Sequence, residues 1–353
     1  MGTVILVGGA LSPDNKVVFE KILEHCGPRI GLFSTASSNP DKSWETDAAM
    51  FKTHGFDPQR IDITLQNAAT QAHDPQVLAK ITSCTGFYFG GGDQRNLTQA
   101  LLGTPALEVL RCRFTEGAGV SGSSAGTAVM ADPMISGGRS LDTWLGEGEP
   151  VTVEPGFGFI ENLQVDQHFL AWGRFGRLIG AMGQAQVSLG VGVDENTALV
   201  IPEQGAWEVV GISHVVFVER TPIGLQISLL AQGDRFDPTQ QTFLIHPQRR
   251  PIGEPDLEVK NIASTDIFGS RALTSVLIQL IESAESSAVG LSFGATAEAA
   301  FSARGIRARF FKTPSTQGYY GNFAPGDRYS VLRVGLQFEA IRVRVEVESK
   351  AEG

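Results

Sequence analysis

The first 130 residues alternate short apolar runs with longer segments whose apolar residues recur at helical spacing. Residues 3–6 form a strand-like run, and Ser12-Pro13 then opens a segment with one apolar face, NKVVFEKILEHCG. Further strands are predicted at 29–35, 59–64 and 86–89, and further helices at 40–54, 74–82, 94–102 and 105–115. This alternation predicts βαβ units, so we expect an α/β fold with a mostly parallel sheet flanked by helices.

Beyond about residue 185 the pattern changes to strands separated by short turns. Strands are predicted at 187–201, 207–220 and 225–232, with hardly any helix between them. One helix is predicted at 270–285, followed by strand-like residues 303–311 and a long alternating run at 329–349. We therefore expect an α/β domain over residues 1–250 and a C-terminal α+β extension of unknown role over residues 251–353.

Three glycine-rich turns follow predicted strands, at residues 8–9, 90–92 and 122–126. In a parallel sheet, ligands bind at the carboxyl ends of the strands, where these turns fall. The third turn, Gly-Ser-Ser-Ala-Gly, matches G-x-S-x-G between a strand and a helix, which predicts a nucleophile elbow that exposes Ser124. A small-residue turn that lets a helix pack close to a sheet would have the same letters, so the motif does not decide by itself.

Charge and cysteine content narrow the class of protein. The formal net charge of −10 argues against nucleic acid or an anionic membrane as a partner. No run of about 18 apolar residues occurs, so no transmembrane helix is predicted. Cys26, Cys84 and Cys112 form no C-x-x-C pair and are expected to be reduced structural thiols. We predict a cytoplasmic protein with no metal site and no cofactor.

A serine hydroxyl becomes a nucleophile only when a base takes its proton and a third group orients that base. Among the six histidines, His168 lies in the most unusual surroundings, VDQHFLAWGRFGRL, where acid, amide and two guanidinium groups fall within twelve residues. Arg174 and Arg177 are three residues apart and therefore side by side on a helix. For the third group Glu195 stands out, because an acidic pair there ends an apolar strand.

Four motifs in this order resemble those of the cyanophycinases and of the serine-peptidase family that also contains aspartyl dipeptidase, peptidase E. They are GGDQ at 91–94, GSSAGTAVM at 122–130, DQHF with the downstream G-R-x-G-R at 166–177, and GVDENTA at 192–198. The resemblance covers about residues 3–235 and is far more specific than any one motif. It implies that residues 1–250 are the catalytic domain of a serine-type exopeptidase that acts as a homodimer.

The resemblance also implies roles for single residues. Ser124 would be the nucleophile, His168 the general base and then acid, and Glu195 the group that orients His168. Backbone N–H groups of Gly91, Gly92 and Ala125 would form the oxyanion hole. The substrate pocket would be lined by Gln94, Gln167, Arg174 and Arg177, while Asp166 would either line it or hold its loop. The implied reaction is hydrolysis of cyanophycin, an arginylated polyaspartate, to β-Asp-Arg dipeptides.

Two departures from the family pattern leave other functions open. Trp172 stands where cyanophycinases usually have an arginine, and we expect it to pack into the core from its helix. Residues 251–353 have no counterpart in the short form of the family. The alternatives are an aspartyl or isoaspartyl dipeptidase of the same family and a catalytically silent relative that binds peptides.

Overall fold

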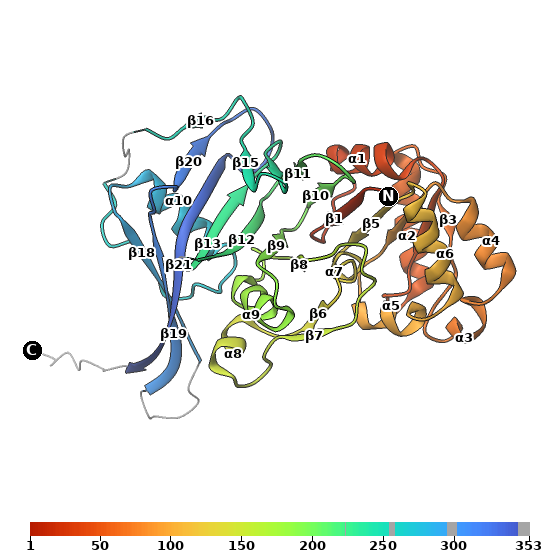
Figure 1. The fold of residues 1–353 in the computed structure, drawn as a ribbon, viewed down its shortest axis with the longest axis horizontal. Coiled ribbons are helices and arrows are strands. Elements are labelled where there is room, and N and C mark those ends of the chain that lie inside the picture. Colours follow the sequence, from red (N-terminus) through yellow and green to blue (C-terminus); the bar gives the residue numbers. More distant parts are fainter. Residues whose placement is uncertain (223, 254–257, 295–301, 345–353) are drawn as a thin grey trace, which may run out of the picture.

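The computed structural model describes residues 1–222, 224–253, 258–294 and 302–344, which form two large sheets with helices around them. In Figure 1 the sheet built mostly from N-terminal strands lies on the right, and the sheet that receives the C-terminal strands lies on the left. Within the described residues no helix is both long and apolar enough to cross a membrane.

The first sheet has nine strands and is mixed, so the prediction of a mostly parallel sheet is wrong. Its parallel part pairs β3, β2, β4, β5 and β1, and its antiparallel part continues from β1 through β10, β11 and β14 to β15. The strands are β1 (Val4–Val7), β2 (Ile30–Phe33), β3 (Gln59–Arg60), β4 (Gly86–Phe89), β5 (Gly119–Ser123), β10 (Thr197–Ile201), β11 (Trp207–Gly211), β14 (Arg235–Asp237) and β15 (Thr242–Leu244). Short connections join β10 to β11 and β14 to β15, and such connections allow only antiparallel neighbours, whereas parallel pairing needs a longer crossover.

The helices predicted between the first strands are present. They are α1 (Lys16–Cys26), α2 (Pro40–Thr53), α4 (Pro75–Ser83), α5 (Gln94–Leu101) and α6 (Pro105–Thr115), and the structure adds a short helix that was not predicted, α3 (Ala68–Gln71). The start of α1 differs, because the helix begins after Asn15 rather than at Ser12-Pro13. The Asn15 side chain does not cap the helix and donates instead to the backbone oxygen of Asn196, at 2.8 Å. Cys26 and Cys84 are buried, Cys112 is exposed, and all three are free.

The second sheet has ten strands and runs from the first 250 residues into the C-terminal segment without a break. Its path is β17-β18-β19-β21-β13-β12-β9-β8, and β21 pairs with β13 over Leu225 to Leu229. The strands are β8 (Gln164–Gln167), β9 (Leu189–Val193), β12 (Val215–Thr221), β13 (Gly224–Leu230), β16 (Arg250–Pro251), β17 (Ala263–Ser264), β18 (Ser287–Phe293), β19 (Ser302–Phe311), β20 (Gln317–Tyr320) and β21 (Tyr329–Arg344). The segment predicted as an extension thus completes a sheet that begins in the preceding part of the chain.

The remaining elements lie between or beside the two sheets (Figure 1). They are α7 (Ala125–Ala128), β6 (Met134–Gly137), α8 (Ser140–Leu145), β7 (Thr152–Glu154), α9 (Phe175–Ala185) and α10 (Ala272–Glu282). β8 and β9 are parallel neighbours in the second sheet, and β5 lies between β1 and β4 in the parallel part of the first. The residues that follow these three strands are brought together between the sheets.

Candidate active site

Ser124 occupies a tight turn between β5 and α7. Its φ of +54° lies in the region that non-glycine residues rarely adopt, and such strain is typical of functional sites. Both flanking glycines are required by packing. A Cβ on Gly122 would lie 2.2 Å from the Gly126 oxygen, and one on Gly126 would lie 2.0 Å from the Phe89 oxygen. From residue 118 to 131 only Ser124 is not buried, so the turn packs closely and still exposes this serine.

His168 and Glu195 complete a hydrogen-bonded chain with Ser124. His168 follows β8, and its Nε2 lies 2.9 Å from the Ser124 Oγ. Glu195 lies two residues beyond β9, and its Oε1 lies 2.6 Å from the His168 Nδ1. A carboxylate accepts the Nδ1–H, which leaves the Nε2 lone pair free to accept the serine proton. The three side chains singled out in the sequence are therefore in the order and at the distances that serine activation requires.

Gly9 holds the imidazole in place, and the sequence interpretation did not assign it a role. A Cβ on Gly9 would lie 2.3 Å from the His168 Nε2, and its φ is +105°. Its neighbour Gly8 accepts the His168 backbone N–H at 2.7 Å, while the Gly9 oxygen accepts the Asn196 N–H at 2.8 Å. The sequence did contain a signal for this role, because Gly8-Gly9 follows the first strand just as the other two glycine turns follow theirs.

Replacing Gly9 by alanine is expected to slow the reaction of Ser124 with a fluorophosphonate by about 10- to 100-fold. The new methyl group would displace the imidazole from the Ser124 hydroxyl. Gly205→Ala is the matched control, because Gly205 has a similar φ of +97° with no atom within 4 Å of the added Cβ. Equal labelling rates for the two variants would contradict the contact proposed for Gly9.

Of the three residues predicted to form the oxyanion hole, Gly91 lies beside the Ser124 hydroxyl. The position of a Cβ on Gly91 lies 3.9 Å from the Ser124 Oγ, so this turn faces the serine. Gly92 has a φ of +142° and packs against the Ala36 oxygen, which a Cβ would approach to 2.1 Å. Within the described ranges, no hydrogen bond occupies the N–H of Gly91, Gly92 or Ala125. Their role as oxyanion donors stays a prediction.

Asp47 of α2 lies against this glycine turn, with its Oδ2 3.3 Å from the position of a Cβ on Gly90. Burial raises the pKa of Asp47 from 3.8 to about 6. The folded state therefore binds the proton more tightly than the unfolded state does. The contribution to stability is present below pH 3.8 and is lost as the pH rises through about 6.

We therefore expect Asp47→Asn to stabilise the protein near neutral pH. Its free energy of unfolding should exceed that of the wild type by about 2–3 kcal/mol. This difference should shrink as the pH falls, because Asp47 becomes protonated, and it should vanish below the ordinary aspartate pKa of 3.8. Denaturant unfolding at a series of pH values measures it. Glu45→Gln, on an exposed position of the same helix, is the control and should change stability by less than about 0.5 kcal/mol. A pH-independent difference between Asp47→Asn and the wild type would contradict this origin.

Asp166 contacts the two predicted arginines and is not accessible to a ligand. Its carboxylate is buried and accepts two hydrogen bonds from Arg177, from Nε at 2.7 Å and from Nη2 at 2.5 Å. An Arg174 nitrogen lies 3.7 Å from the same carboxylate, and the Arg174 guanidinium donates to the backbone oxygen of Gln167 at 2.7 Å. Burial lowers the pKa of Arg174 to about 10, so its guanidinium stays charged at neutral pH. Of the two roles left open for Asp166, these contacts favour holding the loop.

The two predicted glutamines lie differently. The Gln167 Oε1 is 3.5 Å from the Ser124 Oγ, so this amide faces the serine. The Gln94 Nε2 donates to the Ile135 oxygen of β6 at 2.8 Å, which ties the start of α5 to the small sheet. The structure thus brings Gln167 to the serine, while the Gln94 side chain donates to the backbone of β6.

The prediction that Trp172 packs into the core is wrong. Its side chain is 59% exposed and stacks on the His168 imidazole, with ring centroids 4.7 Å apart and an angle of 18° between the planes. The Arg174 guanidinium carbon lies 4.2 Å from the centre of the indole ring. The tryptophan lies in the turn before α9 begins, where no helical face directs it inward. It forms part of the surface around the site.

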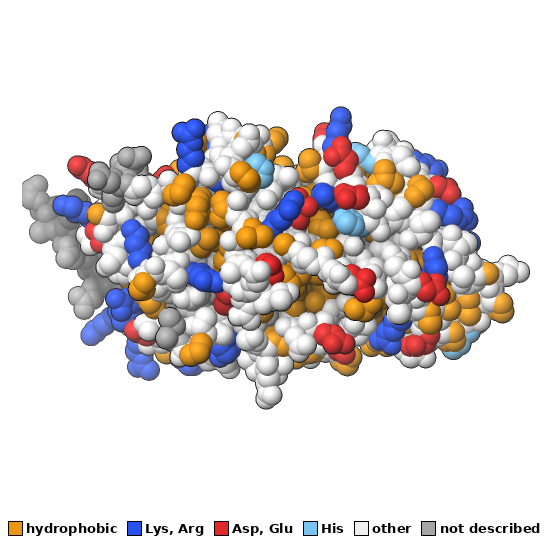
Figure 2. All heavy atoms as spheres, turned by 45° about the horizontal axis from the view of Figure 1, so that its top comes forward, with side chains coloured by type: hydrophobic (Ala, Val, Ile, Leu, Met, Phe, Trp, Pro, Cys, Tyr) orange, Lys and Arg blue, Asp and Glu red, His pale blue; other side chains and the backbone are white. Residues whose placement is uncertain are grey.

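A hollow of about 490 Å³ opens beside Trp172. Its lining combines the arginines described above with a carboxylate and two aromatic rings, from Gly138, Arg139, Ser140, Leu141, Glu149, Trp172, Gly173, Arg174, Arg177 and Phe268. Phe268 belongs to the segment after residue 251, so the C-terminal part contributes to this wall. Figure 2 shows basic and acidic side chains interspersed over the face in view.

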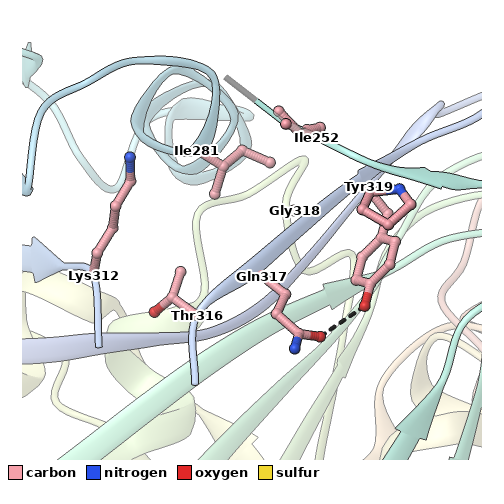
Figure 3. Close-up of a pocket in the computed structure, with 9 residues that line it drawn as sticks. Ile252, Ile281, Lys312, Thr316, Gln317, Gly318 and Tyr319 are labelled. Atoms are coloured by element: carbon pink, nitrogen blue, oxygen red, sulfur yellow. Dashed lines mark hydrogen bonds between the residues drawn. The ribbon is translucent and has the colours of Figure 1, made fainter. Parts of the chain in front are cut away.

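A second hollow, of about 400 Å³, lies in the C-terminal part between α10 and β20 (Figure 3). Lys312 reaches its rim and donates to the Ser283 oxygen at 2.7 Å, and the Tyr319 hydroxyl donates to Gln317 at 2.7 Å. The residues that line this hollow include no serine, cysteine or histidine. Among the described residues, no group of three or more His, Cys, Asp or Glu side chains is arranged to hold a metal ion.

Comparison with known proteins finds similar sequences and structures among the peptidases. The sequence profile of peptidase family S51 matches residues 4–209. The cyanophycinase of Trichormus variabilis is 32% identical over 266 residues, which cover 68% of this chain and 87% of that protein. The cyanophycinase of Synechococcus elongatus is 33% identical over 226 residues, covering 62% and 68%. Among solved structures, a peptidase from an acI-B1 Actinobacterium shares the fold with a TM-score of 0.52 and 22% identity, over 67% of this chain and 97% of that one.

Proposed function

Because the chain belongs to peptidase family S51 and is therefore a serine-type peptidase, we propose that it hydrolyses cyanophycin to β-Asp-Arg dipeptides. One observation carries the proposal, the hydrogen-bonded chain from Glu195 through His168 to Ser124, at 2.6 and 2.9 Å. The names of the similar cyanophycinases support the choice of polymer. A homodimer in the cytoplasm remains our prediction for its assembly and location.

In the first half of the reaction, the His168 Nε2 takes the Ser124 proton as the oxygen attacks the carbonyl of a backbone aspartyl bond. Glu195 accepts the His168 Nδ1–H and stabilises the imidazolium that forms. The N–H groups of Gly91, Gly92 and Ala125 donate to the oxyanion of the tetrahedral intermediate. His168 then protonates the leaving amine, and the acyl group stays on Ser124 as an ester.

In the second half, a water molecule loses a proton to His168 and attacks that ester. The same oxyanion donors stabilise the second tetrahedral intermediate. The Ser124 oxygen leaves and regains its proton from the imidazolium. The Gln167 amide oxygen, 3.5 Å from the Ser124 Oγ, lies where it would contact the reacting group of the substrate.

The charges around the hollow support a substrate that carries both carboxylates and guanidinium groups. Arg174 donates to a single backbone oxygen among the described partners and retains further N–H groups for a substrate carboxylate. Glu149 lines the hollow with a side chain that is 70% exposed and pairs with the equally exposed Arg139 at 3.1 Å, and a substrate guanidinium would compete with Arg139 for this carboxylate. The Trp172 indole already stacks on the His168 imidazole and lies under the Arg174 guanidinium, so it supports these two groups beside the hollow.

The test is incubation of the purified chain with insoluble cyanophycin, with a synthetic β-aspartyl dipeptide series and with no substrate. Release of β-Asp-Arg from the polymer by the wild type and not by Ser124→Ala is the expected result. Cleavage of dipeptides without clearing of the polymer would replace this substrate by that of an isoaspartyl dipeptidase, an outcome that the tryptophan at position 172 would explain. No cleavage together with no labelling by a fluorophosphonate would favour a silent peptide-binding protein.

A further inference from the structure

Two loops of the C-terminal segment contact the turn after His168 and the turn before β12. The Arg271 N–H donates to the Leu170 oxygen at 2.8 Å, and a Cβ on Gly173 would lie 1.8 Å from the Phe268 oxygen. The Asp327 N–H donates to the Ile212 oxygen at 2.9 Å. These contacts connect residues 268–271 to the turn after His168 and residue 327 to the turn before β12.

Asp194 is the point where these loops meet the site. Its carboxylate is fully buried, directly before Glu195 in the chain. Oδ1 accepts the backbone N–H groups of Leu170 and Ala171 at 3.0 and 2.9 Å, and Oδ2 accepts the Ser213 hydroxyl at 2.6 Å. One carboxylate thus joins the turn that carries His168 to the turn that carries Glu195.

A buried carboxylate is stable only with hydrogen bonds and a neutralising charge. In the part of the chain that the structure describes, the cation within ion-pair distance of Asp194 is Arg271, at 3.4 Å. Asp327 lies 3.5 Å from another nitrogen of the same guanidinium, and it also lies 3.0 Å from the His214 Nδ1. Arg271, which neutralises Asp194, and Asp327, which holds the Arg271 guanidinium, therefore both come from the C-terminal segment.

We propose that Arg271 is a positioning residue of the active site: through Asp194 it fixes the turn of His168 against the turn of Glu195. The C-terminal segment is then part of the catalytic framework rather than a separate appendage. This inference rests on the hydrolase mechanism proposed above but not on the identity of the substrate, because it concerns the alignment of Ser124, His168 and Glu195.

Arg271→Met removes the charge and keeps most of the side-chain stem. It is expected to lower both kcat and the rate of fluorophosphonate labelling of Ser124 by about 10- to 100-fold, with little change in KM, because misalignment affects the chemical step rather than substrate contacts. Arg271→Lys restores a charge beside Asp194 and should recover most of the loss. A role in stability alone would lower the melting temperature and leave the activity of the folded protein unchanged.

Arg307→Met is the matched control, because Arg307 is an exposed arginine of the same segment that pairs with Glu339 at 3.0 Å on β21. Equal labelling rates of folded Arg271→Met and Arg307→Met would overturn the proposal, as would failure of Arg271→Lys to recover activity. If Arg271→Met does not fold, Asp327→Asn removes one anchor of the guanidinium and should lower labelling in the same direction. Unchanged labelling in that variant would also overturn it.

The experiments test the proposed substrate and the positioning role of Arg271 independently. Labelling of Ser124 does not depend on cyanophycin, so a wild type that is labelled but does not clear the polymer refutes the substrate and still allows the Arg271 comparison. A polymer-degrading wild type whose Arg271 variants match the control refutes the positioning role alone.

Discussion

Ser124→Ala is expected to lower kcat for cyanophycin hydrolysis by about 10⁵- to 10⁶-fold, to the rate that binding and oxyanion donors alone support. The reason is that alanine forms no acyl intermediate, while His168, Glu195 and the backbone donors keep their positions. KM should change little, because the serine hydroxyl makes few contacts with the rest of the substrate. Release of β-Asp-Arg dipeptide over time measures both constants.

The neighbouring serine provides the control for this variant. Ser123 is the last residue of β5 and is buried, with its hydroxyl beside that of Tyr88. Ser123→Ala removes the other hydroxyl of the motif and should retain activity within a few-fold of the wild type. If both alanine variants lost activity equally, the assignment of the nucleophile to Ser124 would be wrong.

Glu195→Gln is expected to lower kcat by about 10³- to 10⁴-fold with the site otherwise intact. The amide group of glutamine can donate to the His168 Nδ1, which places the ring proton on Nε2. That nitrogen then donates to the Ser124 oxygen and cannot accept its proton. The loss would therefore arise from the wrong tautomer and not from a missing contact, so KM should stay close to that of the wild type.

Two comparisons check this explanation. Glu203→Gln changes an exposed carboxylate that pairs with the N-terminal amine, and it should leave kcat unchanged. Fluorophosphonate labelling of Glu195→Gln should fall in parallel with kcat, because the same proton transfer activates Ser124 in both reactions. Unchanged labelling would mean that Glu195 acts on the substrate rather than on His168.

Local patterns in the sequence predicted most of the first sheet and its helices. The helices between β1 and β5 lie where apolar residues recur at helical spacing, because such a face is buried wherever the helix packs. The direction of strand pairing was predicted less well. β10 is buried along most of its length, as the parallel strands are, so its apolar run did not reveal that β10, β11, β14 and β15 form the antiparallel half of the sheet.

The sequence by itself determined the glycine turns, the order Ser124, His168, Glu195 and the arginines that follow, because these depend on residue types and spacing along the chain. Only the tertiary structure decided that Gly9 contacts the imidazole, that Trp172 is exposed and stacks on it, and that Arg271 reaches Asp194. Residues 9 and 168, and likewise 194 and 271, are far apart in the chain. Contacts over such distances are set by how the sheets pair and pack, which leaves no local signature in the sequence.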